Sequence, residues 1–517
     1  MPDEPQHRLK LTRREMSRLL GAGLLGGALP AMGHVEPGAP PKPVQPGIIP
    51  ADELLAAPVS DIARAIRTGA VSSQVLTLAY LRRIEAVNPG LNAIVHVSAA
   101  QAMDAARQAD DALSAGAQTG PLHGVPMTLK DSIDTAGVQT TWGTLGRSQY
   151  VPQHDATVAS RLRAAGAVLL GKTNTPEFTL SFETDNLVFG RTRNPFDPAR
   201  SPGGSSGGAA AAVTSALCAF DIGSDTGGSI RVPSHCCGTA GLKPTQGRVP
   251  RTGHAVSFGG IHDPLTQLGP IARSVADLEL IFRIIAGPDG QDPFIPPVPL
   301  RDSSAITIRG LRIGWHADNG IFTPSPDIQA VTAAAAKALV EAGAVTREVV
   351  PGTLPRTLEE LNPLFVWNSD GGAWIQRMLD AAGTSKPHPL IAEQITDQWQ
   401  VDSAEFTRLM EQRDRFRGAM LAFMQDYDAL LTPVAGFVAP PYGTAEDEAH
   451  FPGYSYTQVY NLSGQPVVVV RCGTSPEGLP IGVQIAAQPW REDVALAVAR
   501  HLETVFGGWQ APPLKSA

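Results

Sequence analysis

Apolar and polar positions repeat along most of this chain in one recurring order. A segment with apolar side chains every three or four residues comes first, then a glycine turn, then a short run of consecutive apolar residues. The first spacing is typical of an amphipathic helix and the second of a buried strand. Repeated alternation of the two predicts an α/β fold in which helices cover a central sheet.

The first helices are predicted just after residue 50. Ser60 should cap a helix that buries Ile62 and Ile66. Ser72 or Ser73 should cap the next helix, whose inward positions are expected to be Val75, Leu76, Ala79 and Ile84. Further helices are predicted over 98–115, from a cap at Asp155 to Ala165, and over 326–342 and 492–505.

Strands are predicted where short apolar runs lie between turns. The expected segments are 125–129, 167–170, the start of 307–316, 429–431, 467–470 and 481–485. The run AAAAVTSALCAF at 209–220 predicts a buried helix followed by a buried strand. Residues 355–425 have a helical pattern and contain Trp367, Trp374 and Trp399, which either cover a pocket or pack in a core.

Composition narrows the class of protein. Apolar residues make up 43% of the chain and charged residues 17%, with a net charge of -8. Such a globular, mildly acidic chain has no basic footprint for nucleic acid or an anionic membrane. We find no internal repeat and, beyond the N-terminal region, no apolar run long enough to span a bilayer as a helix. The four cysteines are expected to be buried free thiols, with a cystine as the alternative.

Residues 1–33 resemble an export signal. Thr12-Arg13-Arg14-Glu15-Met16 is similar to a twin-arginine motif, and a weakly apolar run from Leu19 to Ala31 follows it. The alternative is the basic start of an amphipathic helix. Residues 34–50 are rich in proline and are predicted to form an extended linker. We therefore expect a periplasmic or secreted bacterial protein.

The candidate chemistry lies between Gly203 and Arg231. Two Gly-Ser clusters, GGSSGG at 203–208 and DTGGSIR at 225–231, flank the predicted helix and strand. A flexible linker is the plain alternative, but a linker does not continue into a buried helix. A Walker phosphate loop is excluded because no lysine closes it. Clustered main-chain N–H groups and serine hydroxyls are what acyl transfer needs.

Ser229 is the candidate nucleophile. It follows Thr226-Gly227-Gly228, and the main-chain N–H groups of residues 226–229 are expected to form an oxyanion hole. The alternative is a serine that caps a helix beginning at Ile230. No histidine is placed as its base, since His123, His235 and His254 are expected to pack or form hydrogen bonds. A neutral lysine is the other solution, and the residues alone leave Lys130, Lys172 and Lys243 open.

Many segments share a resemblance to one family. They are GVPMTLKD (124–131), GKTNTPEF (171–178), NLVFGRTRNP (186–195), SPGGSSGG (201–208), DTGGSIRVP (225–233), GLKPTQGRVP (241–250), LLTP (430–433), NLSGQPVVVV (461–470) and GLPIGVQ (478–484). In order and spacing the chain resembles the amidase signature family of serine hydrolases from about residue 55 to about residue 505. The resemblance implies a single domain over 51–510 with a central mixed β-sheet covered by helices on both faces, and a variable helical segment, 355–425, over the pocket.

The resemblance also implies roles for single residues. Lys130 stands where the family has its catalytic lysine, and Ser205 where it has a serine that follows a cis peptide bond, bridges Lys130 to Ser229 and contacts substrate. Thr179 falls where a main-chain group faces the substrate. Ser206 is expected to be a hydrogen-bond partner in the relay, and Asp225 and Arg231 are expected to brace the oxyanion loop, or to form only a local ion pair.

The implied activity is hydrolysis of a non-peptide carboxamide to a carboxylate plus an amine or ammonia, through an acyl-enzyme. The resemblance implies a small-molecule substrate, no metal or cofactor, no stable membrane insertion, and a monomer or homodimer. The alternatives are the glutaminase subunit of a tRNA amidotransferase, and an esterase or carbamate hydrolase on the same scaffold. A binding protein with an inactive fold is disfavoured because Lys130, Ser205 and Ser229 are all present.

Overall fold

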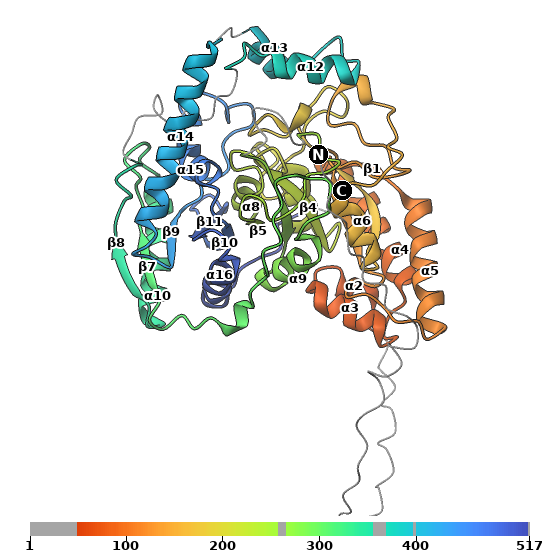
Figure 1. Ribbon diagram of the computed structural model, residues 1–517. Helices are drawn as coiled ribbons and strands as arrows, with labels where there is room; N and C mark the ends of the chain where they lie inside the picture. Colours follow the sequence, from red (N-terminus) through yellow and green to blue (C-terminus); the bar gives the residue numbers. More distant parts are fainter. Residues whose placement is uncertain (1–48, 257–264, 355–368, 397–399, 515–517) are drawn as a thin grey trace, which may run out of the picture. The chain divides into compact units, whose positions relative to one another are not determined.

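A large mixed sheet lies at the centre of the fold (Figure 1). The computed structural model describes residues 49–256, 265–354, 369–396 and 400–514. Within them, eight strands form this sheet in the order β4-β6-β5-β10-β11-β9-β7-β8. The strands are β4 (Phe220–Asp225), β5 (Ala240–Lys243), β6 (Gln267–Ala272), β7 (Arg312–Trp315), β8 (Val345–Glu348), β9 (Ala429–Pro433), β10 (Val467–Thr474) and β11 (Pro480–Ala487).

The predicted apolar runs account for the centre of this sheet. The valines at 467–470 are buried in β10, which pairs antiparallel with β5 and β11. A strand buried on both faces reads as a continuous apolar run rather than an alternating one. At the far edge β7 pairs parallel with both β8 and β9. The sheet is therefore mixed, and helices cover both of its faces (Figure 1).

A second, smaller sheet holds part of the candidate site. Its strands are β1 (Ile94–Val97), β2 (Pro126–Lys130) and β3 (Val168–Thr173), in the order β1-β3-β2. Several bonds join β2 to the start of the large sheet; among them, Ala219 N–H donates to the Pro126 carbonyl at 3.1 Å, and Thr128 Oγ1 donates to Asp221 Oδ2 at 2.5 Å. The sequence pattern predicts β2 and β3, but neither β1 nor the separation of these strands into a sheet of their own.

Most helices occur close to where periodicity predicts them, whereas those over 51–54, 275–285 and 455–463 are not predicted. In the first half they are α2 (Ala51–Leu54), α3 (Val59–Arg67), α4 (Ser73–Leu91), α5 (Ala99–Ser114), α6 (Thr157–Ala164), α7 (Gly207–Thr214), α8 (Arg231–Cys237) and α9 (Val275–Ile285). In the second half they are α10 (Pro326–Glu341), α12 (Ala373–Ala382), α13 (Pro389–Thr396), α14 (Ser403–Phe423), α15 (Ser455–Ser463) and α16 (Glu492–Phe506).

The predicted helix starts are correct in one case and wrong in two. Ser72 caps α4 and accepts from the Val75 N–H, although the Val75 side chain is exposed rather than inward. Ser60 lies inside α3, whose N-cap is Pro58. Asp155 does not cap α6; its carboxylate accepts from the Ala136 N–H and pairs with Arg163. Tertiary partners compete successfully for such side chains.

Several predicted features lie outside the described residues. They are residues 1–33, most of the linker 34–50, and Trp367 and Trp399. In the described part of 355–425 the chain is helical, as predicted, and forms α12, α13 and α14. Trp374 on α12 packs beside an apolar cluster that includes Phe178 and Leu180, so this tryptophan has a packing role.

The state of the cysteines agrees with the expectation of buried free thiols. Cys218, Cys236, Cys237 and Cys472 are free thiols, and all four are buried. Within the ranges that the structure describes, no helix combines the length and the apolar character needed to cross a membrane.

Candidate active site

Lys130 ends strand β2 and directs its amine at a group of serine hydroxyls. Its Nζ lies 2.6 Å from Ser205 Oγ, 2.9 Å from Ser206 Oγ and 3.0 Å from Ser224 Oγ. The side chain is fully buried. Desolvation lowers the pKa of Lys130 well below its ordinary value, against the attraction of two nearby carboxylates. The site therefore favours a neutral amine in contact with hydroxyls.

Ser206 restricts how this amine shares its protons. Ser206 Oγ donates to the Ser224 carbonyl at 3.2 Å and accepts from the Ser224 N–H at 3.3 Å. A hydroxyl has one proton, so Ser206 Oγ must accept from Lys130 Nζ. A neutral amine with one N–H directed at Ser206 keeps its second N–H and its lone pair for Ser205 and Ser224.

Ser205 lies in the loop that precedes α7. The Gly204–Ser205 peptide bond is cis. Glycine is required at 204 because a Cβ atom there would lie 2.4 Å from the Glu183 carbonyl oxygen. The next N–H, that of Ser206, donates to the Ser229 carbonyl at 3.2 Å. This bond places the loop of Ser205 directly beside the loop of Ser229.

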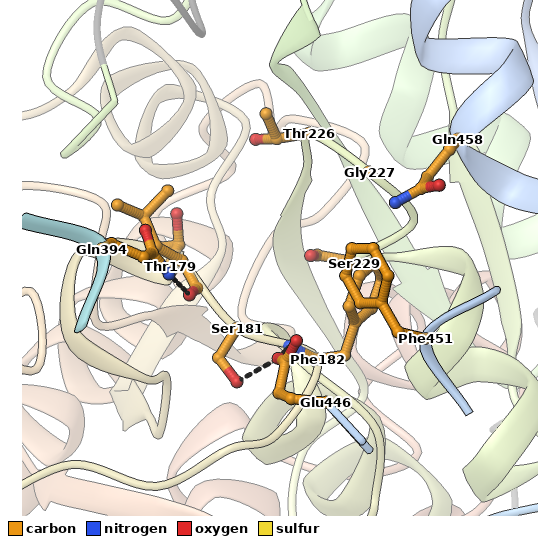
Figure 2. A pocket seen from close by; sticks show the side chains of 11 residues that line it. Thr179, Ser181, Phe182, Thr226, Gly227, Ser229, Gln394, Glu446, Phe451 and Gln458 are labelled. Atoms are coloured by element: carbon orange, nitrogen blue, oxygen red, sulfur yellow. Dashed lines mark hydrogen bonds between the residues drawn. The ribbon is translucent and has the colours of Figure 1, made fainter. Parts of the chain in front are cut away.

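Ser229 lies in the connection from β4 to α8. Figure 2 shows its hydroxyl directed toward the cavity rather than along the helix. The N-cap of α8 is Ile230, and no side chain caps that helix, so Ser229 is not a capping residue. Among the described residues, no acceptor meets the main-chain N–H groups of Gly227, Gly228 or Ser229. These donors remain available to an oxyanion in the cavity.

A buried ion pair holds this loop in shape. Arg231 Nε and Nη2 donate to the two Asp225 oxygens at 2.9 and 2.8 Å, and Asp225 Oδ2 also accepts from the Ile230 N–H at 3.1 Å. Both side chains are fully buried. Burial alone would raise the pKa of Asp225, but the charge and hydrogen bonds of Arg231 outweigh it and hold that pKa at about 2. Asp225 and Arg231 therefore brace the loop.

A cavity of about 230 Å³ opens beside Ser229 (Figure 2). Its wall is largely apolar. Among the described lining residues, Glu446 is the only one with an acidic or basic side chain, and the other polar groups are hydroxyls and amides. Burial raises the pKa of Glu446, which favours the neutral acid. The lining residues are Thr179, Leu180, Ser181, Phe182, Thr226, Gly227, Ser229, Gln394, Glu446, Phe451 and Gln458.

Thr179 lines this cavity from an unusual turn. Phe178 and Thr179 have φ angles of 51° and 65°, in the left-handed region that bulky and β-branched residues rarely adopt. The turn is held by bonds from Phe178 N–H to the Trp142 carbonyl at 2.8 Å and from Thr179 N–H to the Pro176 carbonyl at 3.0 Å. Backbone held in this region is frequent at ligand sites.

The other two buried lysines stand elsewhere. Lys172 Nζ donates to the Ile133 carbonyl and to Thr135 Oγ1, and Lys243 Nζ donates to the Pro244 carbonyl at 3.1 Å. Neither contacts Ser205 or lines the cavity. We therefore assign Lys172 and Lys243 to the support of the fold rather than to the candidate site.

The three histidines near the signature are hydrogen-bonded to structure. His123 Nε2 contacts the Ala109 carbonyl, His235 bridges the Phe437 carbonyl and the Gly482 N–H, and His254 bonds Ser132 and Val256. None of the three lines the cavity beside Ser229. This agrees with the expectation that they pack or form hydrogen bonds.

Sequence reasoning missed Ser224 and Gln458. Ser224 is the third hydroxyl on Lys130, and its position in a wholly buried strand was the available signal. Gln458 lines the cavity from α15, next to a predicted strand segment. The sequence spacing around Gln458 does not indicate a site residue, because only the packing of α15 against the oxyanion loop brings Gln458 to the cavity.

No group of histidine, cysteine, aspartate and glutamate side chains in the described part of the chain could hold a metal ion. The fold holds a buried lysine amine against serine hydroxyls, beside the loop of Ser229. The Amidase family model matches residues 75–496. The chain belongs to the amidase signature family and is an amide-hydrolysing enzyme.

Similar proteins include a tRNA amidotransferase component and a cyclic dimer hydrolase. A glutamyl-tRNA(Gln) amidotransferase subunit of Synechococcus sp. (strain WH7803) is 36% identical over 472 residues, covering 85% of this chain and 95% of that protein. A solved 6-aminohexanoate cyclic dimer hydrolase in complex with substrate has a TM-score of 0.80 at 29% identity, over 89% and 99% of the two chains. The corresponding amidotransferase structure from Thermotoga maritima has a TM-score of 0.71 at 25% identity, over 89% and 98%.

Proposed function

We propose that this enzyme hydrolyses a neutral, non-peptide carboxamide through Ser229, Ser205 and Lys130. The observation that carries the proposal is the 2.6 Å contact between Lys130 Nζ and Ser205 Oγ inside a desolvated site. A lysine can act as a base only when it is neutral, and burial is what lowers its pKa. A hydroxyl between the amine and the nucleophile can then carry the proton.

The first half of the reaction forms an acyl-enzyme. Ser229 Oγ attacks the carbonyl carbon, its proton passes to Ser205 Oγ, and the proton of Ser205 passes to the Lys130 amine. The tetrahedral oxyanion is held by the main-chain N–H groups of the 226–229 loop, each typically contributing about 3 kcal/mol in the transition state. The proton then returns by the same path to the departing nitrogen as the C–N bond breaks. The products are the ester of Ser229 and a free amine or ammonia.

The second half reverses the relay with water as the nucleophile. Water attacks the ester carbonyl, its proton passes through Ser205 to Lys130, and a proton returns to Ser229 Oγ as the ester C–O bond breaks. The carboxylate product leaves the site. The relay needs no group beyond the three side chains, the oxyanion donors and water.

The experiment is an amide panel with a chemical probe. Wild-type enzyme and Ser229→Ala are assayed on aliphatic, aromatic and peptide C-terminal amides, and are treated with a fluorophosphonate followed by mass spectrometry. We expect turnover of at least one amide and one covalent adduct in the wild type, and neither in Ser229→Ala. Ser215→Ala is the matched control, since Ser215 is a buried serine outside the cavity, and it should retain both. Labelling of Ser229→Ala would refute this nucleophile.

A second candidate is a glutaminase subunit of a tRNA amidotransferase. It is favoured by the 36% identity to the Synechococcus protein. Free glutamine carries an ammonium and a carboxylate, and the described lining of the cavity offers only Glu446 as an ionisable partner. We therefore rank it second. Glutamine in the same panel tests it, because turnover of glutamine above all other amides would reverse the ranking.

Esters and carbamates are further substrates that the same relay could cleave. Each amide in the panel is therefore paired with its methyl ester and its carbamate analogue. We expect the amide to have the higher kcat/KM, because the relay can return a proton to a poor, basic leaving group. A higher kcat/KM for the ester or the carbamate would change the assigned bond type.

We also propose that the enzyme is exported to the periplasm. The support is the paired Arg13-Arg14 and the weakly apolar run up to Ala31. In a Tat-competent host, fractionation should place the wild-type protein in the periplasm and the double variant Arg13→Lys, Arg14→Lys in the cytoplasm. Equal distribution of the two proteins would contradict the proposal.

A further inference from the structure

Gln458 has a buried side-chain amide with no partner of its own. The residue is fully buried on α15, and among the described residues neither Oε1 nor Nε2 has a hydrogen-bond partner. Figure 2 shows the amide directed toward Gly227 and the interior of the cavity that Ser229 lines. Buried polar groups are nearly always satisfied, so an unpartnered one at a cavity wall points to a ligand.

The helix that carries Gln458 is held in place by bonds of the two residues that precede it. Thr457 Oγ1 donates to the Gly227 carbonyl at 2.8 Å, and the Thr457 carbonyl accepts from Arg231 Nη1 at 2.8 Å. The carbonyl of Tyr456 accepts from Gln484 Nε2 at 2.8 Å. The bonds of Thr457 tie α15 to the oxyanion loop and its brace, and they fix the backbone from which the Gln458 side chain projects.

Among the other side chains of the described lining, Thr179 Oγ1 is also buried without a partner, whereas the following groups are engaged. Ser181 Oγ donates to Glu446 Oε1 at 2.7 Å, and that oxygen also accepts from the Phe182 N–H at 2.6 Å. The side-chain amide of Gln394 donates to the Leu180 carbonyl at 3.4 Å. Gln458 therefore offers the free side-chain amide of this cavity, with both a donor and an acceptor, among apolar walls.

We propose that Gln458 is a specificity-determining residue that binds a second neutral amide of the substrate, beside the carboxamide that is cleaved. The substrate carbonyl would accept from Gln458 Nε2 and the substrate N–H would donate to Oε1. N-acylated amino-acid amides with an apolar side chain carry this chemistry. A charged group in the same place would be desolvated without a counter-charge, which is costly. This inference rests on the proposed amide hydrolysis.

The test compares two substrates that differ by one group. N-acetyl-L-phenylalaninamide carries the second amide, and 3-phenylpropanamide is the same molecule without it. We expect wild-type enzyme to prefer N-acetyl-L-phenylalaninamide by on the order of 100-fold in kcat/KM. A substrate without the second amide leaves the buried amide of Gln458 unpaired. In Gln458→Met, which keeps the length of the side chain, the preference should fall below about tenfold. Gln488→Met is the matched control, because the Gln488 amide is bonded to main-chain carbonyls outside the cavity, and it should keep the wild-type preference.

Binding separates this inference from the proposed reaction. With Ser229→Ala, calorimetry should show N-acetyl-L-phenylalaninamide bound about 10- to 100-fold more tightly than in Ser229→Ala, Gln458→Met. Equal affinity, or no binding to either protein, overturns the role of Gln458. Binding with the expected difference but no turnover of either amide by wild-type enzyme would contradict the proposed hydrolysis instead and leave the role of Gln458 standing.

A stability measurement distinguishes recognition from a structural role. If Gln458 serves the substrate, the unliganded protein should gain from its replacement by an apolar side chain, and Gln458→Met should raise Tm by about 1 to 2 °C. A residue that supports α15 would instead lower Tm when replaced. A lower Tm together with an unchanged substrate preference would assign Gln458 to the fold alone.

Discussion

Two parts of one site treat their polar groups in opposite ways. Among residues that do not line the cavity, Lys130 and Ser206 have partners for all their hydrogen-bonding groups, and the Asp225–Arg231 pair has its charges and hydrogen bonds matched. On the wall formed by α15, Gln458 is left with unused hydrogen-bonding capacity. Catalysis requires groups whose positions and protonation are set before substrate arrives, whereas recognition requires groups that substrate completes. We infer that the residues around Lys130 serve the proposed reaction and that Gln458 serves substrate selection.

The largest effect is expected on kcat when Lys130, the proposed base, is removed. Lys130→Met should lower kcat by about 10²–10⁴-fold, because the relay then has no proton acceptor. Lys243→Met is the matched control: it also removes a fully buried lysine, yet one that donates only to the Pro244 carbonyl. Steady-state kinetics and circular dichroism of both variants measure the contrast. An equal loss of kcat in the two variants would remove the distinction between these lysines.

The next effect concerns the brace of the oxyanion loop. Asp225→Asn leaves the fully buried Arg231 without its counter-charge and should lower the free energy of unfolding by about 3–5 kcal/mol. Asp197→Asn removes an exposed partner of Arg200, 3.7 Å away, and should change stability by less than about 1 kcal/mol. Urea unfolding of the three proteins gives the comparison. Similar values for the two variants would show that burial does not set the strength of this pair.

A smaller effect is expected in the pH profile. Activity should rise toward alkaline pH, since Lys130 works only when neutral, and a maximum near pH 5 would contradict this. The negative charge of Asp221 raises the pKa of Lys130, so Asp221→Asn should move the acid limb of kcat to lower pH, by on the order of half a unit. Burial raises the pKa of Asp221 to about 6, and below that pH the difference between the proteins should fade. An acid limb that moves upward would refute the coupling.

The smallest effect tests stability at a lysine outside the relay. Burial lowers the pKa of Lys243 to about 7 from its ordinary value of 10.5. Between those values the unfolded chain binds a proton that the folded chain lacks, so this lysine destabilises the fold, fully below pH 7 and not at all above pH 10.5. Lys243→Met should therefore raise Tm by a few degrees at pH 6 and by little at pH 10. A gain that grows with pH would contradict this sign.

Local pattern was enough to predict most helices and strands of this protein. The run 467–470 and the positions Leu76 and Ile84 after Ser72 are buried as predicted, because a strand or helix buries the side chains that its own geometry aligns, although Val75 of the same pattern is exposed. The wrong helix starts at Ser60 and Asp155 have the opposite origin. A capping side chain can take another partner, as Asp155 does with Arg163, and the sequence does not contain that competition.

The sequence by itself determined the family, because the order and spacing of many motifs are those of the family, and it pointed to Lys130, Ser205 and Ser229 as the residues of the proposed reaction. The residues alone left Lys130, Lys172 and Lys243 open and the family resemblance pointed to Lys130, but only the tertiary structure placed Lys130 Nζ 2.6 Å from Ser205 Oγ. It also decided that Ser224 joins them and that Gln458 faces the cavity. Burial and hydrogen-bond partnership across 75 residues or more are properties of packing, and no local pattern records them.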